Sequence, residues 1–341
     1  MDLLQFTDRG IYCPAADVYI DPWRPVKKAL ITHGHSDHAR YGHQAYIATE
    51  DAVPVIRHRL GHHIKIKGVK YGETLRINGV NFSFHPAGHI PGSAQIKVEK
   101  NGLIWVVSGD YKREHDGIST EFQPVKCHTF ISECTFGLPV FRWFPQHKVF
   151  DQMAAWCQKN SEYGVTSVLA VYALGKAQRV IKHLSERITL PIYTHGAIEN
   201  INEVLRSQGI GVPATQRVTG VDKNVLKRQA GILLTTPSSL TENWLRQFGD
   251  YSIGIVSGWM AMRGPRRRRA ADVGFVLSDH ADWQALNDCI EATGAQKIFT
   301  THGYTDIFAK WLTEKGYDAQ AVVTEYKGES IDQEEETAMI E

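Results

Sequence analysis

Four side chains of the kinds that bind metal ions lie within six consecutive residues, His33-Gly34-His35-Ser36-Asp37-His38. The segment directly follows the apolar run Ala29-Leu30-Ile31-Thr32, which predicts a buried strand that ends where the histidines begin. Imidazoles and a carboxylate crowded at one strand end repel one another or lose their hydration unless cations hold them together. We therefore expect the segment to bind two adjacent divalent ions. The alternative is a solvated, His-rich surface loop.

Composition and charge narrow the classes of protein that the chain fits. With 341 residues, 43% of them hydrophobic, it is long enough for two globular domains. Its net charge of +1 gives no general reason to bind nucleic acid, so such a partner has to be argued from local charge. Five cysteines without a Cys-x-x-Cys pair argue against a disulfide framework and a zinc ribbon. This cysteine usage fits a reducing cytoplasm, and no apolar run approaches the length of a membrane span, so we expect a cytoplasmic protein without a membrane partner.

Two patterns of secondary structure divide the chain. Residues 1–135 contain short apolar runs and turn signals, and Asn101-Gly102 predicts a hairpin between strands 94–99 and 103–108. From about Phe150, helical and strand patterns alternate, which is typical of an α/β unit. The clearest elements of this part are helices at 149–159 and 176–186 and strands at 167–172 and 232–235.

Other candidate ligands stand alone, each just past an apolar run. They are His89, Asp110, Glu133, His280 and His302. Ligands collect at the carboxyl ends of strands in layered α/β proteins, so one site can gather all of these residues. Asp110 is our candidate for bridging two ions, because a carboxylate can bridge and a histidine cannot. A lone His89 or His302 is more often a packed or surface histidine, but beside the six-residue segment both become candidate ligands.

At these residues the sequence resembles the metallo-β-lactamase superfamily. The matching motifs are Asp21, the segment His33-Gly34-His35-Ser36-Asp37-His38, His89 and Asp110. The resemblance extends to the β-CASP nucleases, whose additional motifs are matched by Glu133, His280, His302 and Gly175-Lys176-Ala177-Gln178. Within them the chain looks most like the bacterial ligase-associated DNA damage response exonucleases, on the segments Ser257-Gly258-Trp259, 263–269 and 277–282.

The resemblance implies a fold of the α/β (α+β) class in which both ends of the chain form one domain. Residues 1–145 and 271–341 would form an αββα metallo-β-lactamase sandwich, with an acidic tail from about residue 329. Residues 146–270 would form an inserted α/β β-CASP domain that covers the metal edge.

The resemblance also implies a role for each site residue. One ion would be bound by His33, His35, His89 and Asp110, and the other by Asp37, His38, Asp110 and His302. Asp21 would orient the ligand side chains without binding an ion itself. Asp37, His280 and Glu133 are the implied catalytic residues, with His280 held by Glu133 and placed to hydrogen-bond the scissile phosphate or protonate the leaving oxygen. The ions would be Zn²⁺, with Mn²⁺ as the alternative.

The implied function is that of a two-metal DNA exonuclease in DNA repair, in which a metal-bound hydroxide attacks the phosphodiester. It would be associated functionally with an ATP-dependent DNA ligase and a helicase. His302 favours the alternative of an RNA-processing ribonuclease, because this position is usually histidine in RNA-cleaving β-CASP enzymes and valine in eukaryotic DNA-cleaving ones. A carbonyl-ester, thioester or lactam hydrolase and an inactive nucleic-acid-binding scaffold are further alternatives.

Three features outside the ligand set are candidate substrate contacts. Lys176 begins a predicted helix, where backbone amides favour a phosphate, and the alternative is a solvated lysine. Arg263, Arg266 and Arg268 belong to a basic run whose alternating side chains cannot all reach nucleic acid. Trp143 can stack on an unpaired base. For the aromatic segment around Trp143 we favour a packed hinge between domains.

Overall fold

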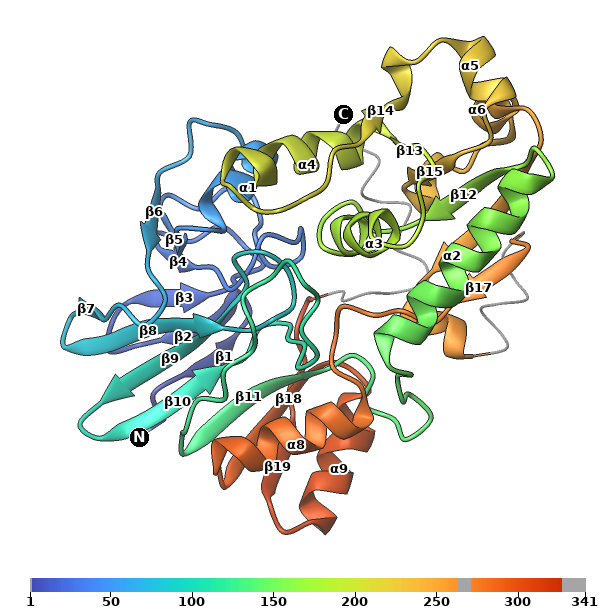
Figure 1. Ribbon diagram of the computed structural model, residues 1–341. Helices are drawn as coiled ribbons and strands as arrows, with labels where there is room; N and C mark the ends of the chain where they lie inside the picture. Colours follow the sequence, from blue (N-terminus) through green and yellow to red (C-terminus); the bar gives the residue numbers. More distant parts are fainter. Residues whose placement is uncertain (1, 263–270, 327–341) are drawn as a thin grey trace. The chain divides into compact units, whose positions relative to one another are not determined.

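The computed structural model describes residues 2–262 and 271–326, which form two compact units (Figure 1). The first unit contains the described residues up to Arg142 together with those from Asp279 onward. The second contains the described residues from Trp143 to Ser278. That the middle of the chain is an inserted β-CASP domain with limits at 146 and 270 stays a prediction. The acidic residues from about 329 lie outside the described part of the chain.

Two mixed sheets form the first unit. The six-stranded sheet has the order β1 (Gln5–Thr7), β2 (Gly10–Cys13), β3 (Val18–Ile20), β4 (Ala29–Leu30), β5 (Tyr46–Thr49) and β6 (Ile66–Val69). The seven-stranded sheet has the order β19 (Asp318–Ala321), β18 (Lys297–Gly303), β11 (Thr129–Cys134), β10 (Leu103–Val107), β9 (Ala94–Lys100), β8 (Val80–Pro86) and β7 (Leu75–Ile77). Strands from both ends of the chain therefore pair in one sheet, since β18 and β11 are parallel neighbours.

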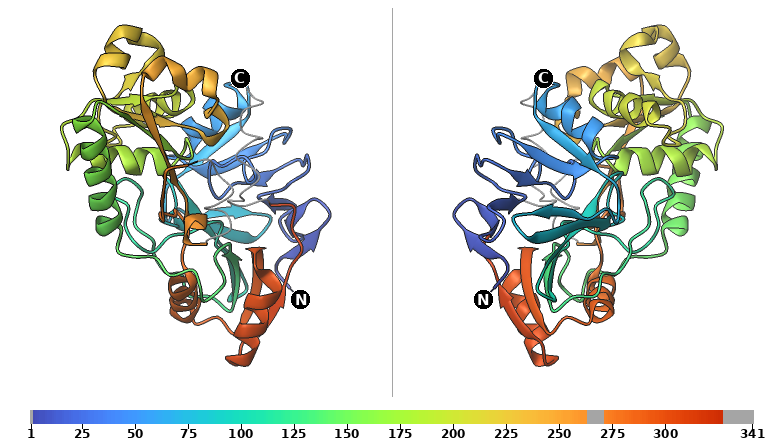
Figure 2. Two further views of the ribbon diagram at one scale, coloured as in Figure 1. Left: turned by 90° about the vertical axis from the view of Figure 1, so that its right-hand side faces the viewer. Right: turned by 90° about the vertical axis from the view of Figure 1, so that its left-hand side faces the viewer.

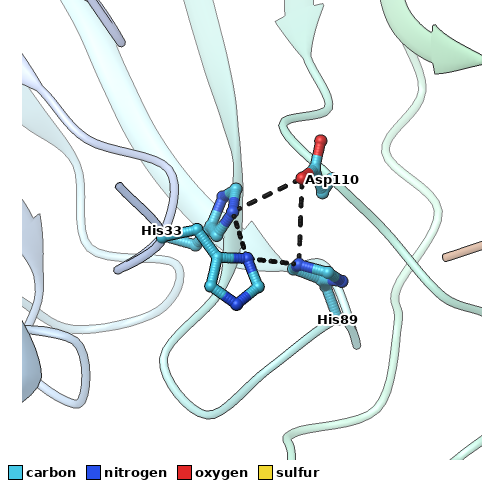
Figure 3. Close-up of side chains that lie close together, drawn as sticks. His33, His89 and Asp110 are labelled. Atoms are coloured by element: carbon cyan, nitrogen blue, oxygen red, sulfur yellow. Dashed lines mark hydrogen bonds and ion pairs between the residues drawn. The ribbon is translucent and has the colours of Figure 1, made fainter. Parts of the chain in front are cut away.

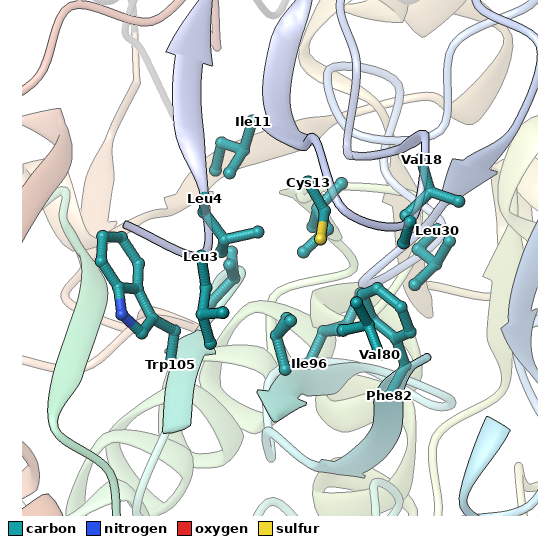
Figure 4. Close-up of a cluster of buried hydrophobic side chains, with 14 of the residues drawn as sticks. Leu3, Leu4, Ile11, Cys13, Val18, Leu30, Val80, Phe82, Ile96 and Trp105 are labelled. Atoms are coloured by element: carbon teal, nitrogen blue, oxygen red, sulfur yellow. The ribbon is translucent and has the colours of Figure 1, made fainter. Parts of the chain in front are cut away.

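A hydrophobic core lies between these two sheets (Figure 4). Leu30 of one sheet and Phe82, Ile96 and Trp105 of the other belong to it. Because side chains alternate along a strand, the neighbours of core residues point to the outer faces. Val106, for example, follows Trp105 and belongs to a different cluster.

Helices cover both outer faces of the paired sheets. On the seven-stranded sheet, α8 (Trp283–Thr293) and α9 (Thr305–Glu314) pack in the cluster that contains Val106 (Figures 1 and 2). On the six-stranded sheet, α1 (Val53–Leu60) packs through Ile56 in a third cluster. The predicted αββα layering is thus confirmed.

The hairpin predicted at Asn101-Gly102 is also confirmed. Strands β9 and β10 are antiparallel, with Leu103 opposite Lys100. Asn101 and Gly102 both have positive φ, 51° and 81°, as a tight turn between twisted strands requires.

The second unit contains a six-stranded, all-parallel sheet with helices on both faces. Its order is β14 (Gln216–Arg217), β13 (Ile192–Thr194), β15 (Ile232–Thr235), β12 (Thr166–Ala170), β16 (Tyr251–Val256) and β17 (Val273–Phe275). The α-helices in the described part of this unit are α2 (Gln146–Glu162), α3 (Lys176–Ser185), α4 (Gly196–Ser207), α5 (Lys223–Arg228) and α6 (Glu242–Leu245). Leu169 packs in the cluster of α2 and α3, while Val168 packs in another, so both faces of the sheet are buried.

The predicted helices of this unit are confirmed, although α2 begins three residues before the predicted start at 149. Its first residues, Gln146-His147-Lys148, are polar, so the apolar periodicity gave no sign of the first turn. None of the helices in the described part of the chain combines the length and apolar character needed to cross a membrane.

Candidate metal centre

The segment 33–38 is an irregular loop that follows β4 and Thr32. Thr32 anchors its start: the backbone N–H donates to Oδ1 of Asp21 (2.8 Å), and the hydroxyl donates to Oδ2 of the same carboxylate (2.5 Å). His33 and His38 are 0% and 1% exposed. The alternative of a solvated surface loop is therefore wrong, because both ends of the segment are buried.

One set of side chains from this loop and from later turns forms a first ligand group. Its members are His33, His35, His89 and Asp110, and one ligand atom of each lies within 4.8 Å of the others. Nδ1 of His35 lies 3.2 Å from Nε2 of His33 and 3.0 Å from Nε2 of His89. Figure 3 shows that His33, His89 and Asp110 converge. Oδ2 of Asp110 lies 3.5 Å from Nε2 of His33.

A second ligand group lies beside the first. It consists of Asp37, His38 and His302, again with one ligand atom of each within 4.8 Å of the others. The Nε2 atoms of His38 and His302 are 3.2 Å apart, and Oδ2 of Asp37 is 3.6 Å from Nε2 of His38. Residues distant along the chain thus meet in the first unit, as the sequence predicts.

Asp110 contacts both ligand groups. Its Oδ2 lies 3.5 Å from His33 and 3.5 Å from His38, and its Oδ1 lies 3.8 Å from His302. Oδ1 is buried and accepts no hydrogen bond from the residues that the structure describes. A carboxylate oxygen that is buried without a hydrogen bond raises the free energy of the folded protein, and a cation beside it removes this penalty. Together with the surrounding imidazole nitrogens, this donor set fits divalent metal ions.

Burial and neighbouring charges shift the pKa values of the histidines of the centre in opposite directions. Burial and the neighbouring charge on His38 lower the pKa of His33 well below its usual value, and burial has the same effect on the pKa of His89. Both imidazoles are therefore neutral, the form that binds metals. Burial also opposes the charged form of His38, but the carboxylates of Asp110, Asp37 and Asp21 raise its pKa well above the usual value.

Two residues of the centre have unusual backbone conformations. Asp21 and His302 have φ values of 42° and 60°, in the left-handed region that non-glycine residues rarely adopt. Asp21 follows β3 directly, and His302 is the last residue but one of β18. Such strain persists only where the surrounding structure compensates for it, and it is commonest at functional sites.

Hydrogen bonds orient two of the candidate ligands. Nδ1 of His38 lies 2.7 Å from Oδ2 of Asp21, the residue predicted to orient the ligand side chains. Nδ1 of His89 donates to the backbone carbonyl of Asp279 (2.8 Å). In each case Nδ1 is engaged, so Nε2 is the nitrogen that faces the other ligands. The Asp279 carbonyl was not predicted, because a backbone atom carries no sequence signal.

His280 and Glu133 form a buried pair beside Asp110. Nδ1 of His280 lies 2.9 Å from Oε2 and 3.0 Å from Oε1 of Glu133. Glu133 also accepts the backbone N–H of Tyr111 (2.8 Å) and the hydroxyl of Thr135 (2.6 Å). The carboxylate therefore orients the imidazole.

Tyr326, which was not among the predicted site residues, also belongs to the candidate metal centre. Its ring is nearly parallel to the rings of His38 and His302, with centroids 4.8 and 4.5 Å away. Tyr326 lies outside every motif of the resemblance, and no local pattern marked it.

Nothing in the structure tests the predicted substrate contacts, although it describes the surroundings of Lys176 and Trp143. Lys176 begins α3 but is 1% exposed, with Nζ 4.6 Å from the ring centre of Tyr172, so the alternative of a solvated lysine is wrong. Trp143, partly buried, belongs to the second unit. Substrate contact by Lys176 or Trp143, and the hinge, stay predictions. Arg263, Arg266 and Arg268 lie outside the described residues.

Comparison with known proteins found relatives but no matching family model. The chain is 28% identical to a probable DNA ligase of Opitutus terrae over 92% of its own length and 30% of that protein. It is 32% identical to the endoribonuclease YSH1 of Yarrowia lipolytica over 36% of its length and 15% of that protein. With ribonuclease TTHA0252 of Thermus thermophilus it shares 27% identity over 52% of its length and 44% of that protein. The chain thus spans less than half of each relative.

The fold also resembles a solved structure, a protein of unknown function from Enterococcus faecalis V583. The TM-score is 0.58 at 10% sequence identity, over 88% of this chain and 80% of that one. At this identity the likeness concerns the fold alone.

Proposed function

The chain belongs to the metallo-β-lactamase superfamily, in its β-CASP branch, and on this premise we propose that it is a metal-dependent hydrolase of nucleic-acid phosphodiester bonds. The observation that carries the proposal is the contact of one carboxylate, Asp110, with both ligand groups. A carboxylate is the ligand type that can bridge two ions. The adjacent pair of Glu133 and His280 adds a group that can hold and move a proton.

We assign two divalent ions to this centre, Zn²⁺ with Mn²⁺ as the alternative. One would be held by the first ligand group, and the other by Asp110 with the second ligand group, Asp37, His38 and His302. When bound, such ions act as Lewis acids and bring the pKa of water near 7. Neutral imidazoles and carboxylates are the donors that suit Zn²⁺, which supports the assignment.

The protein's own groups supply the proton transfers and the positioning. With Nδ1 held by Glu133, His280 would use Nε2 to hydrogen-bond the scissile phosphate or protonate the leaving oxygen. Asp37, whose side chain is 16% exposed, would accept a proton from the attacking water. Asp21 would hold the tautomer of His38.

For the substrate we propose DNA, degraded from an end in DNA repair. The support is the sequence resemblance and the name of the Opitutus relative, a probable DNA ligase that aligns with 92% of this chain. Functional association with an ATP-dependent DNA ligase and a helicase, and a cytoplasmic location, are part of the same proposal. The alternative is RNA, favoured by His302 and by the names of the relatives called endoribonuclease and ribonuclease.

End-labelled DNA and RNA oligomers of one sequence, single- and double-stranded, test substrate and mode together. The full chain is incubated with each in Zn²⁺, Mn²⁺ or Mg²⁺, and kcat/KM and product lengths are measured. We expect higher kcat/KM on DNA and products that shorten progressively from one end. A higher kcat/KM on RNA would establish the alternative. Cuts at internal positions of the oligomers would contradict exonuclease action.

Asp110→Asn tests the centre itself. It keeps the size of the side chain and removes its charge, so we expect kcat/KM to fall more than about 10³-fold, since a metal centre contributes several kcal/mol to the transition state. Asp288→Asn, the same change at an exposed carboxylate paired with Arg113, is the control. Full activity in Asp110→Asn or in metal-free protein would overturn the proposed function.

A further inference from the structure

The chain returns to the candidate metal centre after β19, the last strand of its described part. Residues 322–326, the C-terminal segment, begin with the N–H of Val322 donating to the carbonyl of Thr300 (3.0 Å). Near its end, Arg40 donates through Nη2 to the carbonyl of Glu325 (2.7 Å), and Arg24 pairs with the Glu325 carboxylate (3.1 Å). Arg40 also donates to the carbonyl of Asp37, so one guanidinium joins this segment to the ligand loop.

Tyr326, at the end of the C-terminal segment, lies against the second ligand group. Its ring is within 5° of parallel to both His38 and His302, whose own rings are 5.1 Å apart and 6° from parallel. The histidine rings of the first ligand group instead meet edge-on, at 78° to 86°. The stacked phenol ring thus restricts the imidazoles of one group.

The hydroxyl of Tyr326 acts on the same half of the centre. It donates to the backbone carbonyl of Asp21 (2.8 Å), a residue in the strained left-handed conformation. The Asp21 carboxylate in turn contacts Nδ1 of His38 at 2.7 Å. The hydroxyl therefore supports the residue that orients His38, while the ring restricts His38 and His302 directly.

We propose that Tyr326 is a positioning residue for the second ligand group, and that the C-terminal segment completes the binding site of one of the two ions. The inference rests on the proposed function, because it needs an ion at His38 and His302. Ligands that are already held in place lose less conformational entropy on binding, and partners that orient ligands typically contribute 10- to 100-fold to metal affinity. Loss of Tyr326 should therefore weaken the binding of one ion and leave the binding of the other unchanged.

Calorimetric titration of the metal-free full chain with Zn²⁺ tests this asymmetry. The wild type should bind two ions. In Tyr326→Leu, the affinity for one ion should fall about 10- to 100-fold while the other stays unchanged. Tyr326→Phe keeps the ring and loses the hydroxyl, so a selective loss of about threefold is expected. Val323→Ala, at a side chain that is 95% exposed on the same segment, is the control and should match the wild type.

Visible absorption of the Co²⁺-loaded protein gives a readout independent of activity. In Tyr326→Leu, the absorption spectrum of one bound Co²⁺ ion should change, and the spectrum of the other bound ion should stay the same. If Tyr326→Leu lowers the affinity for both ions equally, or leaves both affinities unchanged, this inference is overturned while the proposed function stands. A wild type that binds fewer than two ions would overturn the proposed function and this inference with it. If Tyr326→Leu does not fold, the selective loss in Tyr326→Phe decides.

Discussion

Glu133 holds His280 in one orientation across 147 residues of sequence. The carboxylate is 0% exposed, and each of its oxygens accepts a second hydrogen bond, from Tyr111 or from Thr135. It cannot rotate without breaking one of these contacts. The imidazole is therefore oriented before substrate binds, which favours proton transfer.

We predict that Glu133→Gln slows the reaction. The amide keeps the volume but replaces one acceptor oxygen with a donor, so His280 loses its fixed tautomer and orientation. We expect kcat to fall about 10²- to 10⁴-fold, with KM and the number of bound ions unchanged. Steady-state kinetics measure kcat and KM, and metal analysis measures the number of bound ions. Glu99→Gln, on a strand surface, should behave as wild type. Loss of an ion in Glu133→Gln would contradict the assignment.

Helix α1 positions the ligand loop through one side chain. Nη1 of Arg59 donates to the carbonyl of Gly34 (2.5 Å), and the carbonyl of Ala39 lies 3.5 Å away. Gly34 is buried, so this carbonyl depends on a protein donor. Burial lowers the pKa of Arg59 to about 10, which still leaves it charged at neutral pH.

We predict that Arg59→Leu destabilises the chain. Without the guanidinium, the Gly34 carbonyl is buried and unpaired, which costs about 1–3 kcal/mol of unfolding free energy. Urea unfolding of the metal-free protein measures the change. Arg57→Leu, on the exposed face of the same helix, should change the free energy by less than about 0.5 kcal/mol. Similar losses in both variants would mean that helix propensity, rather than the loop contact, is responsible.

All five cysteines of the chain are buried, and none forms a disulfide. Cys157 lies in the second unit, and Cys13, Cys127, Cys134 and Cys289 lie in the first. Burial raises the pKa of Cys127 and of Cys157 to about 12. Each unit thus carries a thiol that reports on its opening.

We predict that the native chain barely reacts with a thiol reagent at pH 8. A pKa near 12 leaves a thiolate fraction of about 10⁻⁴ at that pH, and burial blocks access. The fraction rises as pH approaches the pKa, so any native reaction should accelerate between pH 8 and 10. Absorbance with a disulfide reagent should show five thiols only after denaturation. Rapid reaction of Cys127 or Cys157 in native protein would contradict their burial.

Several features followed from the sequence because they depend on local rules. Asn101-Gly102 specifies its hairpin through backbone conformation alone. Helix α3 begins at Lys176 after a glycine, as expected, although the burial of Lys176 was not predictable. The ligand types were also predictable, since crowded imidazoles and carboxylates have few uses other than binding metal.

Residue type and local periodicity were enough to predict which side chains could bind ions and that these side chains follow strand ends. How the side chains are held depends on packing between segments that are far apart in the chain. The Asp279 carbonyl that orients His89, the Tyr111 N–H that donates to Glu133 and the ring of Tyr326 against His38 and His302 are long-range contacts. They arise only when packed sheets bring distant segments together, and the backbone atoms among them carry no residue identity for a sequence pattern to reveal.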